Sequence, residues 1–286
     1  MRIGTYKMIS VIMSCYNSDK EQLKQSIESI LNQTYTDFEF LIADNGEKFN
    51  LEEFLKQFND PRIKYINNNG NIGPVASFNN LHKLAKGKYI ALQDHDDISL
   101  PNRLQFEKEE LDNNHKLQSV SCLIHIFGGK KEHDDGIAME PEQVKEELIF
   151  WQPIKQPTFM KRKEFANKYN YNEWFIYDYE FWSRTRHIPH KIINRIGLNY
   201  RKSASNSSIE RKNNIRFNHC RIIQRNFNEL GLTIPIELCQ MLDPFCHKKF
   251  DKKYIDLFKS CKDVLLKEIS EHLYNRKYNE LCQKMM

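Results

Sequence analysis

KYIALQ, residues 88–93, is followed at once by DHDD, residues 94–97. The first segment is largely apolar, as a strand buried in a sheet would be, and the second places three carboxylates within four residues. Neighbouring carboxylates repel one another, and a bound cation relieves that repulsion. Aspartate oxygens are hard ligands, so the pattern indicates Mn²⁺ or Mg²⁺ at a strand end. The alternative is a solvated turn in which Asp97 or Ser99 caps a helix that starts near Pro101.

Strand and helix patterns alternate through the first 115 residues. This alternation predicts an α/β fold with a mainly parallel, doubly wound central sheet. In such sheets ligands bind beyond the carboxyl ends of the strands, so Asn17, Asp44, residues 71–73 and the acidic run are expected to converge. Strands are expected at 8–14, 38–43 and 88–93, with a weaker one at 62–66, and helices at about 19–31, 51–58 and 74–86, the last closed by Gly87 as a C-cap.

The middle of the chain has a weaker pattern. The run 128–136 is expected to be a solvated loop, and its His133-Asp134-Asp135 is a second, less favoured metal candidate. The segment from Arg184 to Arg221 contains ten Lys or Arg residues and one acidic residue, Glu210. A region with such an excess of positive charge should attract phosphates. Helices are expected at 101–114, 142–150 and 178–186, a buried strand at 118–127, and a tight apolar segment at 157–162.

A helical pattern begins near Ile209. Apolar residues from Ile255 to Leu273 form a stripe at helical spacing, for which packing on the main domain is preferred; a partner helix, a second copy of the chain and a membrane surface are the alternatives. The segment 203–208 is the one compositional seam. We therefore predict a catalytic domain at 1–208, with a donor half at about 8–115 and an acceptor half at about 116–208, and a helical region at 209–286.

Composition limits the class of protein. The formal charge is +5, and seven scattered cysteines form no C-x-x-C pair, which favours free thiols in a reducing compartment. No stretch approaches the length of a membrane span. We expect a soluble, cytoplasmic protein, and we leave open a peripheral contact with the cytoplasmic face of a membrane.

Several motifs, taken in order, resemble the family 2 glycosyltransferases of the GT-A fold. The likeness spans about residues 8–205, and the order and spacing of the motifs make it specific. It implies an inverting, DxD-type, metal-dependent glycosyltransferase with a UDP-sugar donor and a glycan, glycolipid or glycoprotein acceptor. The motifs are SVIMSCYN (10–17), Asp44, Asn71-Ile72-Gly73 with Asn79, AKGKYI (85–90), DHDD (94–97), LPNRL (100–104), PTFMKR (157–162), DYEFWSR (178–184) and Tyr200-Arg201.

The resemblance also assigns the donor site. Asp96 and Asp94 would ligate Mn²⁺ or Mg²⁺ that bridges the donor phosphates, Asp94 would face the ribose, and sharing of the metal by Asp97 stays open. Asp44 can accept a hydrogen bond from a base N–H, or it can serve the turn before Gly46. The donor-binding residues implied are Cys15, Tyr16, Asn17, Asp44, Asn71, Gly73, Asn79, Asp94 and Arg201.

Asp178 is the candidate catalytic base. It matches the second residue of the family's Glu-Asp pair and would deprotonate the attacking hydroxyl; the alternative is a helix N-cap. The sequence departs from the family at five places, which bears on the phosphate contacts and on the acceptor site. These are Ser14 for a proline, Phe78 for an arginine, Gln156 for a histidine, Tyr177 for the glutamate of the pair, and Lys202-Ser203 where a histidine often follows.

Two other classes of function remain. A nucleotide-sugar or nucleic-acid binding protein could use the basic region 184–221, but no known nucleic-acid motif is present and no nucleic-acid partner is expected. A nucleotidyltransferase or diphosphohydrolase could share the metal site, and it would release pyrophosphate or UMP instead of UDP.

Overall fold

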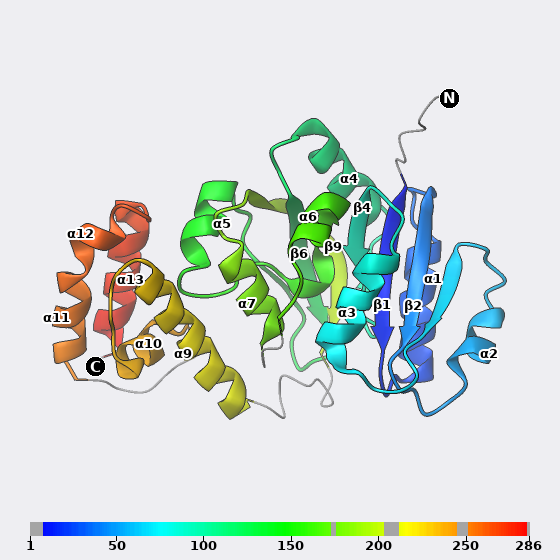
Figure 1. Cartoon of the computed structure of the whole chain (residues 1–286), viewed down its shortest axis with the longest axis horizontal. Coiled ribbons are helices and arrows are strands. Elements are labelled where there is room, and N and C mark those ends of the chain that lie inside the picture. Colours follow the sequence, from blue (N-terminus) through cyan, green and yellow to red (C-terminus); the bar gives the residue numbers. More distant parts are fainter. Residues whose placement is uncertain (1–7, 173–175, 203–211, 245–250, 285–286) are drawn as a thin grey trace. The chain divides into compact units, whose positions relative to one another are not determined.

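The computed structural model describes residues 8–172, 176–202, 212–244 and 251–284 (Figure 1). The chain forms two compact units: unit 1 takes Met1–Pro141, Ile154–Glu173 and Ile188–Ser203, and unit 2 takes Glu142–Pro153, Trp174–His187 and Ala204–Met286. The seam predicted at 203–208 lies outside the described residues. Unit 2 also includes two segments that the sequence assigned to the catalytic domain, so the units do not follow a single cut in the chain.

Unit 1 is built on a mixed sheet, nine-stranded in the described residues, with the order β3-β2-β1-β4-β8-β6-β9-β5 and with β7 paired to β6. The first four strands in this order are parallel, β8 runs antiparallel to β4 and β6, and β9 runs parallel to β6. The strands are β1 (Ile9–Cys15), β2 (Phe38–Asp44), β3 (Ile63–Asn67), β4 (Tyr89–Leu92), β5 (Ile98–Ser99), β6 (Ser119–Phe127), β7 (His133–Asp135), β8 (Met160–Arg162) and β9 (His190–Arg201).

Helices cover both faces of this sheet. In Figure 1, α3 lies in front of the sheet and α1 lies behind it. The strand order reverses between β1 and β4, so the carboxyl ends of these strands form the switch point where ligands of open α/β sheets bind. The helices of unit 1 are α1 (Lys20–Leu31), α2 (Leu51–Lys56), α3 (Gly73–Leu84), α4 (Arg103–Asn113), the 3₁₀ turn η1 (Gln156–Thr158) and α6 (Lys163–Lys168).

The apolar patterns explain these elements. Both faces of β1 are buried, and its residues from Ile9 to Met13 are all apolar except for Ser10. Helix α1 begins after Asp19, whose side chain accepts hydrogen bonds from the main-chain N–H groups of Glu21 and Gln22. Its apolar face packs into the core of unit 1. The α/β fold class predicted from the sequence is confirmed.

The prediction for Gly87 is wrong. Helix α3 ends at Leu84 with Ala85 as its C-cap, and Gly87 does not adopt a positive φ. A Cβ atom on Gly87 would lie 2.5 Å from the main-chain nitrogen of Ser10 and 2.6 Å from the oxygen of Met8. Glycine is therefore required because β1 passes directly over this position.

Two strands depart from the predicted pattern. The expected loop 128–136 contains β7, which pairs with β6 in an antiparallel register. The basic region contains β9, a twelve-residue strand for which the sequence predicted charge but no strand. Its outward positions carry polar and basic side chains, so its apolar run is interrupted.

Unit 2 is helical in its described residues. Most of the expected stripe is buried in one cluster with side chains of the other helices of this unit. This cluster includes Ile149 and Phe150, which the sequence assigned to the catalytic domain, and packing of the stripe on unit 1 stays a prediction. No described helix is both long and apolar enough to cross a membrane. The helices are α5 (Pro141–Glu147), α7 (Tyr177–Arg184), α9 (Lys212–Glu229), α10 (Ile236–Leu242), α11 (Lys253–Ser260), α12 (Lys262–Leu265) and α13 (Glu271–Gln283).

Candidate active site

The acidic turn 94–97 connects β4 to β5 at the switch point of the sheet. Its main chain is held by two buried side chains that the sequence analysis missed. Ser26 of α1 donates from Oγ to the carbonyl oxygen of Asp94 at 2.7 Å, and Gln93 donates from Nε2 to the carbonyl oxygen of Asp97 at 2.8 Å and to Ser26 Oγ at 2.9 Å. The signal in the sequence is a polar residue at the end of an apolar strand and another on the apolar face of a helix.

Arg201, at the end of β9, also holds this turn. Its main-chain N–H donates to Asp97 Oδ1 at 2.8 Å, and its Nε donates to the carbonyl oxygen of Asp96 at 2.8 Å. Nη2 donates to Gln25 Oε1 at 2.7 Å, and the guanidinium lies 4.6 Å from the ring centre of Phe127. The structure thus gives Arg201 a role in shaping the turn, and its contact with a donor phosphate stays a prediction.

Asp97 is the most deeply buried carboxylate of the turn, at 1% exposure. Its Oδ2 atom is buried and accepts no hydrogen bond from any described residue. Burial raises the pKa of Asp97 well above its ordinary value, and the charges of Asp94 and Asp96 raise it further, while the hydrogen bond from Arg201 opposes them. A cation beside this carboxylate would offset both the cost of burying its charge and the repulsion from the charges of Asp94 and Asp96.

The capping alternative for this turn is wrong. Helix α4 has Asn102 at its N-cap position and no side-chain capping bond. Ser99 instead donates from Oγ to Gln93 Oε1 at 2.6 Å, and Asp97 accepts from Arg201. The carboxylates are therefore not used to start a helix.

The loops after β1 and β2 lie side by side. Cys15 and Asp44 are paired in the parallel register at the carboxyl ends of the two strands. Tyr16 is 49% exposed, and Asn17 has a φ of 58°, a left-handed conformation that asparagine tolerates better than most residues. The side chain of Cys15 is fully buried, so only its main chain remains for the predicted donor contact.

Asp44 serves a turn in the structure. Its Oδ1 accepts hydrogen bonds from the main-chain N–H groups of Gly46 at 3.0 Å and of Glu47 at 2.9 Å. Its Oδ2 lies 3.4 Å from the hydroxyl of Tyr65. The turn role offered as the alternative is thus present, and recognition of a base by Asp44 stays a prediction.

A network of asparagine side chains joins the loops after β2 and β3. Asn71 Oδ1 accepts from the main-chain N–H of Gly73 at 2.9 Å, and Asn45 Oδ1 accepts from that of Ile72 at 3.1 Å. Gly73 has a φ of 81°, so glycine serves the turn, which was one of its two predicted roles. Asn45 and Asn68, both buried and 3.4 Å apart between Oδ1 and Nδ2, were missed by the sequence analysis.

Asn79 is bound by the main chain of Tyr171. Its Nδ2 donates to the carbonyl oxygen of Tyr171 at 2.9 Å, and its Oδ1 accepts from the N–H of the same residue at 3.0 Å. Tyr171 in turn accepts, through its hydroxyl, a hydrogen bond from Gln156 Nε2 at 3.0 Å. The structure therefore gives Asn79 a structural role, and its predicted donor contact is left without supporting geometry.

Asp178 belongs to unit 2, and its meeting with the acidic turn of unit 1 remains a prediction. Helix α7 begins at Tyr177 with Ile176 at the N-cap position, so the capping alternative for Asp178 is wrong. Asp178 Oδ2 accepts a hydrogen bond from Gln152 Nε2 at 3.2 Å. Burial raises the pKa of Asp178 above its ordinary value, and hydrogen bonds from Tyr179 N–H and Gln152 oppose this rise.

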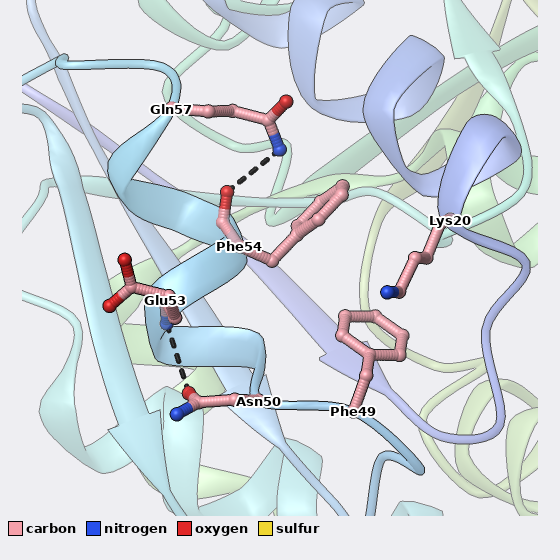
Figure 2. A pocket seen from close by; sticks show the side chains of 6 residues that line it. All are labelled: Lys20, Phe49, Asn50, Glu53, Phe54 and Gln57. Carbon is pink, nitrogen blue, oxygen red and sulfur yellow. Dashed lines mark hydrogen bonds between the residues drawn. The ribbon is translucent and has the colours of Figure 1, made fainter.

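A surface pocket of about 450 Å³ lies between the start of α1 and α2 (Figure 2). Inside it the Lys20 ammonium lies 4.8 Å from the ring centre of Phe49, which packs edge-on against Phe54. None of the predicted site residues lines it, so the pocket does not coincide with the acidic turn. Its lining residues are Lys20, Phe49, Asn50, Glu53, Phe54 and Gln57.

Several residues of the two other charged segments, the basic region 184–221 and His133–Asp135, form ion pairs. In the described part of the basic region, Arg184 pairs with Glu180 at 2.9 Å, Arg186 with Glu229 at 2.8 Å and Lys191 with Glu110 at 2.9 Å. In the His133–Asp135 segment, Asp134 pairs with His125 at 2.7 Å and Asp135 with Lys155 at 2.5 Å. Within the described residues, no group of three or more His, Cys, Asp or Glu side chains is arranged so that it could hold a metal ion.

Comparisons with known proteins agree with this architecture. The crystal structure of S. aureus TarS 1–349 has a TM-score of 0.61 at 14% identity and covers 97% of this chain and 88% of its own. The same protein in complex with UDP-GlcNAc has a TM-score of 0.60 at 13% identity, with 97% and 90% covered. These similarities confirm the predicted GT-A fold.

Proteins related to this chain in sequence are named glycosyltransferases. An uncharacterised glycosyltransferase of Methanocaldococcus jannaschii is 36% identical over 208 residues, which are 68% of this chain and 70% of the relative. WfgD of Escherichia coli, named a UDP-Glc:α-D-GlcNAc-diphosphoundecaprenol β-1,3-glucosyltransferase, is 35% identical over 100 residues, which are 35% of this chain and 39% of WfgD. The family model for glycosyl transferase family 2 matches residues 10–184. With an acidic turn at the switch point of a GT-A sheet and a family match over more than half its length, the chain belongs to glycosyl transferase family 2.

Proposed function

We propose that the protein transfers a sugar from a UDP-sugar to a hydroxyl acceptor with inversion at the anomeric carbon, and that it depends on Mn²⁺ or Mg²⁺. The observation that carries this proposal is the buried acidic turn at the switch point. Asp97 is almost inaccessible there, Asp94 and Asp96 are partly exposed, and Arg201 and Gln93 fix the main chain. A turn so firmly held is suited to a charged ligand.

A UDP-sugar is the donor that the relatives support. WfgD is named for UDP-glucose, and the TarS neighbour was crystallised with UDP-GlcNAc. In this chain the exposed ring of Tyr16 and the carboxylate of Asp44 lie at the ends of adjacent strands, where a base could stack and form a hydrogen bond. The donor sugar is proposed to be glucose or N-acetylglucosamine on the same grounds.

The acidic turn fits a divalent cation that is held in part by substrate. Mg²⁺ commonly uses one or two carboxylates and completes its coordination with water and substrate phosphates, so a complete cluster of protein ligands is not required. The buried Oδ2 of Asp97 and the repulsion within the turn both favour a cation beside Asp96. When bound, the cation would neutralise the charge that develops on the leaving diphosphate.

Asp178 is proposed as the base. Its carboxylate takes the proton of the acceptor hydroxyl as that oxygen bonds to the anomeric carbon, and the bond from the anomeric carbon to the phosphate oxygen breaks to release UDP. A pKa raised by burial brings the carboxyl closer to the range of an effective base. A lipid-linked glycan is the proposed acceptor class, because WfgD is named for one, and it would bring the protein to a membrane surface.

The test compares Asp96→Asn with Asp178→Asn in UDP release from UDP-GlcNAc and UDP-glucose, with Mn²⁺ or with a chelator. Asp96→Asn should lose donor binding and turnover together. Asp178→Asn should keep donor binding and lose turnover by about a hundredfold or more, the usual contribution of a general base. Asp134→Asn, at the paired cluster on β7, is the matched control and should behave as the wild type. Release of UMP or pyrophosphate, or wild-type turnover by Asp178→Asn, would contradict the proposal.

A further inference from the structure

The side chain of Asp178, the candidate base, accepts a hydrogen bond from Gln152 in the loop that follows α5. Gln152 is partly buried, and its Nε2 lies 3.2 Å from Asp178 Oδ2. An amide that donates to a carboxylate stabilises the charged form and restricts the side chain to one rotamer. A general base must be charged before it can take a proton, so this contact acts in the direction that the proposed reaction requires.

The loop that carries Gln152 is fixed to helix α7 through one buried amide. Asn226 of α9 is fully buried, and its Nδ2 donates to the carbonyl oxygens of Leu148 at 3.1 Å and of Ile149 at 3.0 Å. Its Oδ1 accepts from Ser183 Oγ at 2.7 Å, and Ser183 lies on the same helix as Asp178. Asn226 therefore sets the spacing between the segment that bears Gln152 and the helix that bears Asp178.

A second contact holds the same loop from helix α13. Glu147 accepts from Trp151 Nε1 at 2.6 Å through one carboxylate oxygen and pairs with Arg276 through the other. Its carbonyl oxygen also accepts from the main-chain N–H groups of Phe150 at 2.9 Å and of Trp151 at 3.0 Å. Gln152 follows directly, so its main chain starts from a position that two C-terminal helices determine.

We propose that Gln152 is a positioning residue for Asp178, which it holds in the ionised form, and that the C-terminal helices serve to fix this pair. This inference rests on the proposed function of Asp178. Helices α9 and α13 then contribute to the reaction by holding Gln152 and Asp178 in place, in addition to their apolar packing.

The first experiment measures kcat against pH for the purified protein, with UDP-GlcNAc or UDP-glucose and Mn²⁺ as the probes. Gln152→Met keeps the size of the side chain and removes the donor, and Gln152→Glu places a second carboxyl beside Asp178. The acid limb of the profile should move to higher pH in Gln152→Met and further in Gln152→Glu, because a like charge disfavours ionisation more than a lost donor does. At the acid end kcat should fall roughly tenfold in Gln152→Met, with little change in the KM for the donor.

The matched control is Glu146→Gln. Glu146 lies beside Glu147 on α5 and binds Ser270 at the start of α13, at 3.0 Å to its N–H and 2.9 Å to its hydroxyl. Its side chain makes none of the contacts given above for the loop 148–152, and the hydrogen bond from Ile149 N–H to its main-chain carbonyl oxygen at 3.2 Å is kept in the variant, so its profile should match that of the wild type. Profiles of both Gln152 variants that coincide with the wild type would overturn the inference, and a shift in Glu146→Gln as large as theirs would show a structural effect only.

A second measurement needs no turnover. Thermal unfolding of the wild type, Asp178→Asn, Gln152→Met and the double variant forms a double-mutant cycle, and the contact predicts that the two substitutions are not additive. Additive effects would overturn the positioning role. If instead Asp178→Asn keeps full turnover while the cycle shows coupling, the proposed base is wrong and the contact between the two residues stands.

Discussion

Arg201→Ala is the substitution that most directly probes how the acidic turn is held. It removes the hydrogen bonds from Nε to the Asp96 carbonyl at 2.8 Å and from Nη2 to Gln25 at 2.7 Å. The main-chain N–H that donates to Asp97 is kept. The turn should therefore stay in place but lose the side chain that ties it to β9 and to α1.

The expected magnitude follows from these two bonds. A hydrogen bond from a charged donor contributes about 1.5 to 3 kcal/mol, and both bonds here are partly exposed and end on neutral acceptors. Taking the low end, and allowing for water that replaces part of the loss, gives about 2 kcal/mol in the free energy of unfolding. For a unit of this size that corresponds to a fall in Tm of about 4 to 8 °C.

The assay is thermal unfolding of the purified protein, without ligand and then with UDP-GlcNAc and Mn²⁺. Arg201→Lys keeps the charge but loses the planar fork, so it should fall between the wild type and Arg201→Ala. Arg195→Ala is the matched control on the same strand, since Arg195 is exposed and its guanidinium lies 5.6 Å from the ring centre of Phe106. It should cost less than about 1 kcal/mol. A Tm for Arg201→Ala equal to that of Arg195→Ala would refute the role given to Arg201.

Three further substitutions test the packing and the buried carboxyls. Gly87→Ala should lower the free energy of unfolding by about 3 kcal/mol, because its Cβ would lie 2.5 Å from the main-chain nitrogen of Ser10; denaturant unfolding measures this loss. Burial raises the pKa of Glu107 to about 8 against an ordinary value of 4.5, so the folded protein keeps a proton that the unfolded chain releases, and stability falls as pH rises between these values. Glu107→Gln should therefore leave Tm unchanged near pH 4.5 and raise it above pH 8; a parallel pH dependence in both proteins would contradict this. The pKa of Asp178 is raised by the same cause, so Asp178→Asn should match the wild type in Tm at low pH and exceed it at neutral pH, in a series of melts across that range.

Much of the fold could be predicted because its first half is built from strands buried on both faces. Such strands read as mainly apolar runs, as β4 does throughout and as β1 and β2 do apart from a few polar residues such as Ser10 and Glu39. Strand β9 could not be predicted in this way, since most of its positions are only partly buried or exposed and it includes the basic residues Lys191 and Arg195. The prediction for Gly87 is wrong because a glycine that follows a helix suggests a C-cap. The structure requires glycine there for another reason: the strand β1, far away in the sequence, passes over this position.

The candidate site was predictable where its residues are adjacent in the sequence. The acidic turn could be identified because its three carboxylates lie within four positions. The side chains that shape it come from distant segments: Ser26 is 68 positions from Asp94, and Gln25 is 176 positions from Arg201. No local pattern reports such contacts, and the same holds for Gln152 and Asp178.

The most direct test of the account is protection of the protein against thermal unfolding by UDP-GlcNAc and UDP-glucose, each with Mn²⁺ or with a chelator. A ligand that binds the folded state raises its stability by mass action, by about 2.7 kcal/mol at a hundredfold excess over Kd. We expect at least one UDP-sugar to protect the wild type only when the metal is present, and neither to protect Asp96→Asn. Equal protection with the chelator, or full protection of Asp96→Asn, would contradict the claim that the acidic turn holds the donor through a metal.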